Sequence, residues 1–226
     1  MGDDAALIPI LTSVNVACGF HGGDPTTIRE ALTVAADHGV VVNAHVSYAD
    51  LEGFGRRELG ATAAQVEVDT LYQLGALAGL AAAAAVPVRG VKPHGALYHR
   101  SLQDPEVAAA LVSAVAAWDP TAALITAPVG ALRSAAESAG LMVVTEGYVE
   151  RGYGPDGLLI PRGSPCDVID DPDLAASQAV SLARSGRYRS LCVHGDSKRA
   201  TRIASTARTA LLAAGFELVA PAPRGG

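Results

Sequence analysis

Short runs of β-branched and aliphatic residues alternate with helical patterns along nearly the whole chain, and this alternation constrains the fold most. Parallel strands need long crossover connections, usually helices, so strands that alternate with helices indicate βα units and a parallel sheet. The predicted strands cover residues 12–17, 40–44, 88–91, 123–126, 141–145, 191–193 and 216–219. The predicted helices cover residues 25–38, 62–85, 105–118, 130–139, 172–185 and 200–214.

The length of 226 residues fits one α/β barrel, because such barrels often exceed 200 residues around a single core. Half of the residues are hydrophobic and only 18% are charged, so the chain can bury enough apolar surface to fold. The sequence therefore predicts one α/β domain over residues 1–226, a TIM-like barrel with parallel strands. The Gly- and Pro-rich residues 147–165 are predicted to form a long loop of the kind that covers sites.

Charge and cysteine content exclude several classes of protein. The chain has 23 acidic and 17 basic residues and no Lys or Arg run, so we expect no nucleic-acid partner. Its three cysteines lack C-x-x-C spacing, which gives no sign of disulfides or a thiolate zinc site. No secretory signal appears, and the longest apolar run, residues 74–86, is shorter than the roughly 20 residues of a membrane span. We expect a cytoplasmic protein without a membrane partner.

Histidines recur directly after the predicted strands. In a parallel α/β array the active site lies beyond the carboxyl ends of the strands, so polar residues at these places carry weight. A single histidine there is more often structural, but four of the six histidines in equivalent places predict one shared site. These four are His21, His45, His94 and His194, whereas His38 and His99 are expected to be structural.

Lys92 follows an apolar strand and precedes Pro93, so its ammonium group is expected to point inward toward an anionic partner or ligand. Glu146, after the strand at residues 141–145, is a candidate for that carboxylate. Arg151, in the following loop, can hold a substrate carboxylate by a bidentate pair or can be a solvated surface charge.

Residues 50–57 combine glycines with Arg56 and Arg57, which makes this segment a candidate anion-binding loop. No G-x-x-x-x-G-K-[ST] or G-x-G-x-x-G sequence occurs, so a nucleotide would have to bind by other means. Asn15, Asn43 and Asp196 also follow strands, where such residues either line a site or cap a turn.

Six sequence segments together resemble the LamB/YcsF family, and the resemblance extends over residues 2–221. The segments are NVACGFHGGDP, NAHVSYADLEGFGRR, YQLGAL, VKPHGALYH, TEGYVERGY and CVHGD. The resemblance implies an irregular β/α barrel that, with partner subunits B and C, opens the lactam of 5-oxoproline to glutamate at the expense of ATP. Family members usually carry an earlier strand that reads like Asp-Leu-Asn-Cys-Asp-x-Gly-Glu. The expected fold is therefore a barrel that lacks its first strand.

The resemblance also implies roles for the polar residues after the strands. Lys92 is expected to stabilise charge on oxygen, and Glu146 or Asp196 to move protons. The expected catalytic residues are His21, His45, Lys92, His94, Glu146, His194 and Asp196. The expected substrate-binding residues are Asn15, Asn43, Arg56, Arg57 and Arg151.

Two other interpretations stay open at this point. Histidines at strand ends also suit a metal-dependent deacetylase or carbohydrate hydrolase, in which His21, His45 and His94 would hold a divalent ion. The chain could instead be a non-catalytic scaffold for partner subunits. A homo-oligomer is compatible with each of these interpretations.

Overall fold

The structure, a computed structural model, describes residues 4–155 and 157–220. The described chain forms two compact units. The amino-terminal unit is Thr12–Thr145, and the carboxyl-terminal unit is Glu146–Val219 together with the described residues before Thr12. The prediction of one domain over residues 1–226 stays a prediction.

The amino-terminal unit is built on parallel strands that pair in chain order. They are β1 (Ser13–Ala17), β2 (Val41–Val46), β3 (Val88–Pro93), β4 (Ala123–Thr126) and the first part of β5 (Met142–Tyr148). The pairing places Asn15 opposite Asn43 and His45 opposite Lys92. Polar residues from neighbouring strands thus lie side by side.

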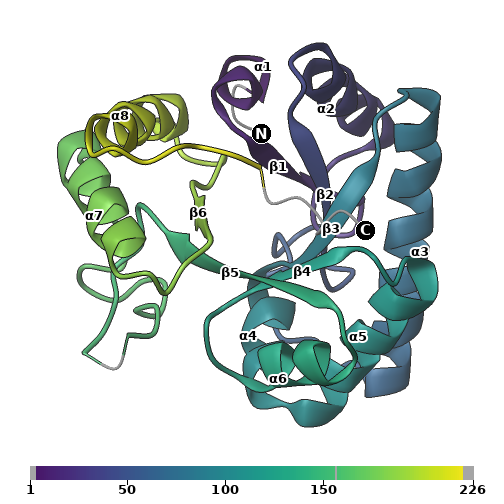
Figure 1. The fold of residues 1–226 in the computed structure, drawn as a ribbon. Coiled ribbons are helices and arrows are strands. Elements are labelled where there is room, and N and C mark those ends of the chain that lie inside the picture. The colour runs from purple at the N-terminus through teal and green to yellow at the C-terminus, as the bar shows by residue number, and fades with distance from the viewer. Residues whose placement is uncertain (1–3, 156, 221–226) are drawn as a thin grey trace. The chain divides into compact units, whose positions relative to one another are not determined.

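Helices follow the strands of this unit, as the alternation predicts. They are α2 (Pro25–Asp37), α3 (Ala63–Ala83), α4 (Gly95–Gln103), α5 (Pro105–Trp118) and α6 (Ala131–Ser138). Helix α5 contacts α3, α4 and α6 (Figure 1). The Asp24 carboxylate accepts from the backbone N–H groups of Thr26 and Thr27, and Thr62 and Gln65 form the predicted capping box.

The carboxyl-terminal unit contains the end of β5, which pairs in parallel with β6 (Ser190–Cys192). Its helices are α1 (Asp4–Leu7), the 3₁₀ helix η1 (Ile8–Ile10), α7 (Pro172–Arg184) and α8 (Ala200–Ala213). Helices α7 and α8 lie side by side (Figure 1). Their core consists of Val149, Ala175, Ala179, Ile203, Ala207 and Leu211.

The fold class is confirmed: the described residues form six parallel strands in chain order that alternate with helices, which is an α/β topology of the TIM-like, partial-barrel type. Six predicted strands are present with small changes of bounds. The seventh, at residues 216–219, is wrong. Phe216 and Leu218 pack on the α7–α8 core instead, so their alternation reflects contact with helices rather than strand pairing.

Helix α4 was not predicted, because its sequence looks like the continuation of a polar site segment and no side chain caps its first turn. The predicted loop at residues 147–165 is largely free of helix, although its first residues belong to β5. Among the described residues, no helix combines the length and apolar character needed to cross a bilayer.

Candidate active site

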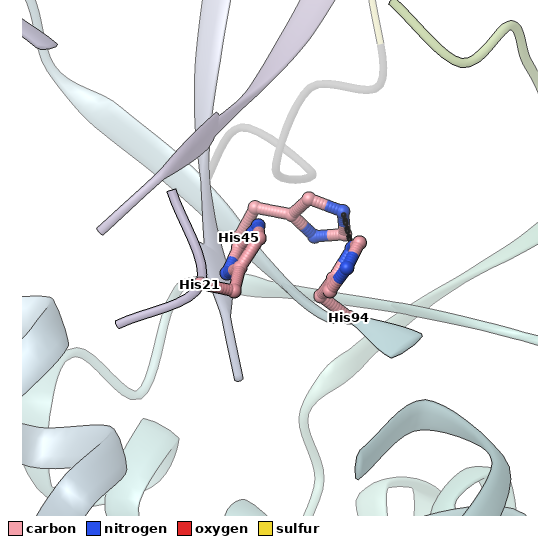
Figure 2. Close-up of side chains that lie close together, drawn as sticks. All are labelled: His21, His45 and His94. Atoms are coloured by element: carbon pink, nitrogen blue, oxygen red, sulfur yellow. Dashed lines mark hydrogen bonds between the residues drawn. The ribbon is translucent and has the colours of Figure 1, made fainter. Parts of the chain in front are cut away.

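Three of the four predicted histidines lie together in the amino-terminal unit (Figure 2). His21 lies in the turn between β1 and α2, His45 lies within β2, and His94 follows β3 as the N-cap of α4. His21 is 3% exposed and His94 is 7% exposed. Parallel pairing of β1, β2 and β3 brings these three sequence segments to one place, as the sequence predicts.

The three imidazole rings pack closely on one another. The rings of His21 and His94 are stacked, with centroids 3.9 Å apart and planes 8° apart. The His45 ring meets both of them edge-on, at centroid distances of 5.5 Å and 4.8 Å. Phe54 closes the cluster with edge contacts to His21 and His94.

Hydrogen bonds to fixed acceptors determine which ring nitrogen carries the proton in the neutral histidines. His45 Nδ1 is 3.0 Å from the Lys92 carbonyl oxygen, and His94 Nε2 is 2.8 Å from that of Phe54. A carbonyl oxygen can only accept, so both nitrogens must donate. The Ser47 hydroxyl donates to the Tyr48 carbonyl oxygen and therefore accepts from His21 Nδ1, 2.7 Å away. The lone pairs thus remain on Nε2 of His21, Nε2 of His45 and Nδ1 of His94.

The environment keeps His21 and His45 neutral near pH 7. Burial, followed by the positive charge of Arg56, lowers the pKa of His21 to about 4. Burial also holds the pKa of His45 well below its usual range, and positive charge at His94, Lys92 and His21 adds to this effect. Neutral imidazoles are bases and metal ligands, and the three offered ligand atoms lie within 4.8 Å of one another. Among the described residues of this unit, the cluster is therefore a place where a metal ion can be held.

The loop at residues 50–57 forms one wall of the histidine cluster. Gly55 has φ +67°, and a Cβ there would lie 2.9 Å from His21 Cβ and 2.9 Å from His94 Cδ2. The Gly55 carbonyl oxygen also accepts from the N–H of Ala96 in α4. Glycine is needed here because the backbone approaches two imidazole rings at once.

Asp50 organises this loop. Its buried carboxylate accepts from the Gly53 N–H and from the guanidinium of Arg57. The bond from Arg57 lowers the pKa of Asp50 to about 2. Arg57 therefore already pairs with a carboxylate of the chain, while the Arg56 guanidinium lies 5.0 Å from the centre of the Phe54 ring. Substrate binding by these two arginines stays a prediction.

Lys92 and the two asparagines lie on the same strands as the cluster. Lys92 is 3% exposed in β3, and its carbonyl oxygen accepts from His45. The Asn43 amide donates to the Asn15 side-chain oxygen at a distance of 3.2 Å. The expected inward position of Lys92 agrees with its burial, whereas the roles of all three residues are untested.

The other predicted residues belong to the carboxyl-terminal unit. Glu146 accepts from the Ser190 hydroxyl at 3.0 Å, and Asp196 is exposed after β6. Arg151 is buried and donates to the backbone carbonyl oxygens of Ile160 and Asp167. These bonds hold the loop that follows β5 in place, so the Arg151 guanidinium already has acceptors within the chain. The prediction that His194 converges with the other three histidines stays a prediction.

Glu150 was missed by the sequence reasoning. Its buried carboxylate accepts from both the backbone N–H and the ring Nδ1 of His194, and the Tyr148 ring stacks on the histidine at 5.2 Å. Burial raises the pKa of Glu150, but the bonds from His194 outweigh it and the net pKa is lowered. The signal in the sequence was the even spacing of Glu146, Tyr148 and Glu150, which is typical of one face of an extended segment.

The Glu150 pair gives a pH-dependent prediction. Replacing Glu150 by Gln should lower the free energy of unfolding by roughly 2 kcal/mol at pH 7, because a buried charge-assisted bond is lost. Since folding lowers the pKa of Glu150 below its ordinary 4.5, this stability exists above pH 4.5 and fades as the pH falls further. Urea unfolding of both proteins from pH 7 to pH 3 should show the difference shrinking.

Glu137→Gln is the matched control, since Glu137 pairs with Arg133 on the exposed face of α6. That change should cost less than about 0.5 kcal/mol at any pH. If Glu150→Gln costs equally little, or if its cost does not change with pH, the Glu150–His194 bond does not stabilise the fold as proposed.

Known proteins resemble the chain over almost its whole length. The family model described as "LamB/YcsF family" matches residues 1–224. The 5-oxoprolinase A subunit of Symbiobacterium thermophilum is 42% identical over 98% of this chain and 89% of its own length. The protein of the same name from Thermus thermophilus is 42% identical over 96% of this chain and 92% of its own length.

A solved structure agrees with the fold. The crystal structure of a lactam utilization protein from Thermus thermophilus matches with a TM-score of 0.92 and 41% sequence identity. The match covers 98% of this chain and 93% of that chain.

Proposed function

Because the chain belongs to the LamB/YcsF family, we propose that it is the A subunit of an ATP-dependent 5-oxoprolinase, a hydrolase of a cyclic amide C–N bond. Its reaction would open the lactam of 5-oxo-L-proline to L-glutamate. The observation that carries this proposal is the cluster of three histidines, one within β2 and the others after β1 and β3, together with the buried Lys92 of β3. Neutral imidazoles supply bases, and an ammonium group stabilises the oxyanion that forms when an amide is attacked.

The chemistry of the lactam explains why ATP is needed. The amine and carboxyl groups of the opened product stay tethered, so reclosure has a high effective molarity and opening needs a coupled reaction. Phosphorylation of the amide oxygen would create a leaving group. The chain has no P-loop sequence, and the relatives are named as one subunit of an enzyme. We therefore place ATP use with an assembly that includes partner subunits B and C, in the cytoplasm.

We assign roles within this proposal as follows. Lys92 stabilises charge on the substrate oxygen, and the histidine cluster supplies bases. His194, oriented by Glu150 through Nδ1, presents Nε2 as an additional base, and Glu146 or Asp196 moves protons. The candidates for holding the substrate remain Asn15, Asn43, Arg56, Arg57 and Arg151.

Reconstitution tests this function. The purified chain alone should release almost no glutamate from 5-oxo-L-proline, with or without ATP. Addition of subunits B and C should give ATP-dependent release, because the coupling step needs a phosphate-binding site that this chain's motifs do not supply. Glutamate release by the chain alone at the rate of the full assembly would refute the division of labour. An assembly that forms but never releases glutamate would refute the function.

The histidine cluster also favours a second candidate, a metal-dependent hydrolase of another amide, such as an N-acetyl group on a sugar. This activity would need neither ATP nor partner subunits. Acetate release from N-acetylated sugars by the purified chain, lost with a chelator and restored by metal, distinguishes it from the first candidate.

A further inference from the structure

We propose that His21, His45 and His94 bind one divalent transition-metal ion of the Zn²⁺ type. Their three offered ligand atoms lie within 4.8 Å of one another. They come from a turn, a strand and a helix N-cap, each fixed by the parallel pairing of β1, β2 and β3. The inference concerns binding to the isolated chain, and in the metal-bound state the three imidazoles act as ligands instead of the bases assigned to them above.

The hydrogen bonds behind the rings prepare them for a metal. Each histidine donates its one N–H away from the cluster: to the Ser47 hydroxyl, to the Lys92 carbonyl oxygen and to the Phe54 carbonyl oxygen. Metal-binding histidines almost always donate their second ring nitrogen to such an acceptor, which fixes the tautomer and makes the ligand nitrogen more basic. Three neighbouring histidines that each donate the N–H to an outside oxygen and keep the other nitrogen for a ligand are typical of a metal site rather than of a packed core.

The contact between His45 and His94 points to the same conclusion. His45 Nε2 and His94 Nδ1 are 3.1 Å apart, yet the N–H of each neutral ring is committed to a carbonyl oxygen. Two lone pairs repel at this distance, and either a shared proton or a metal ion between the two nitrogens removes the repulsion. Two nitrogens of one tetrahedral zinc site lie about 3.3 Å apart, so this pair already has the spacing for a metal.

His21 completes the set after a small movement. Its ring is stacked on that of His94, and its ligand nitrogen lies within 4.8 Å of the other two ligand nitrogens. To reach the nitrogen–nitrogen distance of about 3.3 Å in a zinc site, it must move by at most about 1.5 Å. We expect metal binding to draw the His21 ring in by a turn about its side-chain torsions. Three protein ligands then leave a fourth position for water or substrate, as in catalytic zinc sites.

The ligand chemistry selects the class of ion. Three imidazoles suit Zn²⁺, Co²⁺ or Ni²⁺, whereas Mg²⁺ and Ca²⁺ prefer oxygen ligands. The positive charge of Arg56 lowers the pKa of His21, and that of Lys92 lowers the pKa of His45. The same two charges repel a metal cation at the histidine cluster. The fourth ligand should therefore be an anion, such as hydroxide or a substrate carboxylate, which offsets part of this charge.

Titration of the tag-free chain tests the proposal. The protein is stripped with a chelator and titrated with Zn²⁺ by calorimetry, and then with Co²⁺ as a spectroscopic probe. We expect one ion per chain, a raised melting temperature, and the visible absorption of four-coordinate cobalt. His45→Gln and His94→Gln should each weaken binding more than about 100-fold, which exceeds the loss typical of a residue behind a ligand. Ser47→Ala, which removes the acceptor of His21 and leaves all three ligands in place, should weaken it about 10-fold.

His38→Gln and His99→Gln are the matched controls, because both histidines are exposed, and they should bind as the wild type does. Nitrogen-15 NMR of the wild-type imidazoles identifies the ligands directly, so the test does not depend on the folding of the variants. Zn²⁺ should shift Nε2 of His21 and His45 and Nδ1 of His94 most strongly, and should leave the ring nitrogens of the other three histidines unshifted. Absence of stoichiometric binding, or shifts at other histidines, would overturn the proposal. Neither result bears on ATP-dependent lactam opening, which is measured separately.

Discussion

Replacement of Lys92 by Met is expected to lower kcat/KM of the assembled enzyme about a hundredfold while the chain still folds. The ammonium group of Lys92 is assigned to the substrate carboxylate or to the developing oxyanion, a contact worth roughly 3 kcal/mol in the transition state. Lys92 lies in β3 with 3% exposure, and Pro93 restricts it to extended backbone geometry. Met keeps most of the stem volume and removes the charge.

Lys198→Met is the matched control, because Lys198 is the other lysine of the chain and is exposed after β6. It should leave both kcat/KM and the melting temperature unchanged. Near-normal turnover of a stably folded Lys92→Met assembly would show that Lys92 is only a structural counter-charge.

Replacement of Gly55 by Ala should destabilise the chain by about 3 kcal/mol and reduce turnover strongly. The new Cβ would lie 2.9 Å from both His21 and His94, so the loop and the two rings must move apart. A left-handed backbone at Ala accounts for roughly 1 kcal/mol, and overpacking against the rings accounts for the rest. Urea unfolding and kcat/KM in the assembly measure the two effects.

Gly39→Ala separates the cost of a left-handed backbone at Ala from the cost of overpacking against the rings. Gly39 has φ +66°, nearly the same as the +67° of Gly55, but nothing lies within 4 Å of a Cβ built there. The control should therefore lose only about 1 kcal/mol and keep its turnover. Equal losses for the two variants would mean that Gly55 does not hold the histidine cluster in place.

The histidine cluster could be predicted from the sequence, because the carboxyl ends of parallel strands converge whatever the loops do. His21, His45 and His94 each follow or end a strand that pairs with its neighbour, so strand order alone brings them together. The tautomers could not be predicted. They depend on Ser47 and on the Phe54 carbonyl oxygen, whose positions are set by tertiary packing.

The errors have physical causes of the same kind. The alternation at residues 216–219 suits a strand, but Phe216 and Leu218 alternate because one face packs on helices. Asp50 lies seven positions before Arg57 in the same loop and pairs with it, a contact that the prediction of an anion-binding loop did not include. Glu150 was overlooked because its partner, His194, is 44 positions away and is reached only through β5–β6 pairing.

The measurement that tests the central claim most directly is glutamate formation from 5-oxo-L-proline by the assembly with subunits B and C. The wild-type chain is compared with His94→Gln and with the exposed control His99→Gln. We predict ATP-dependent glutamate release with the wild type and with His99→Gln, and a loss of at least about 100-fold with His94→Gln. Unchanged glutamate release by a folded and assembled His94→Gln variant would contradict the account.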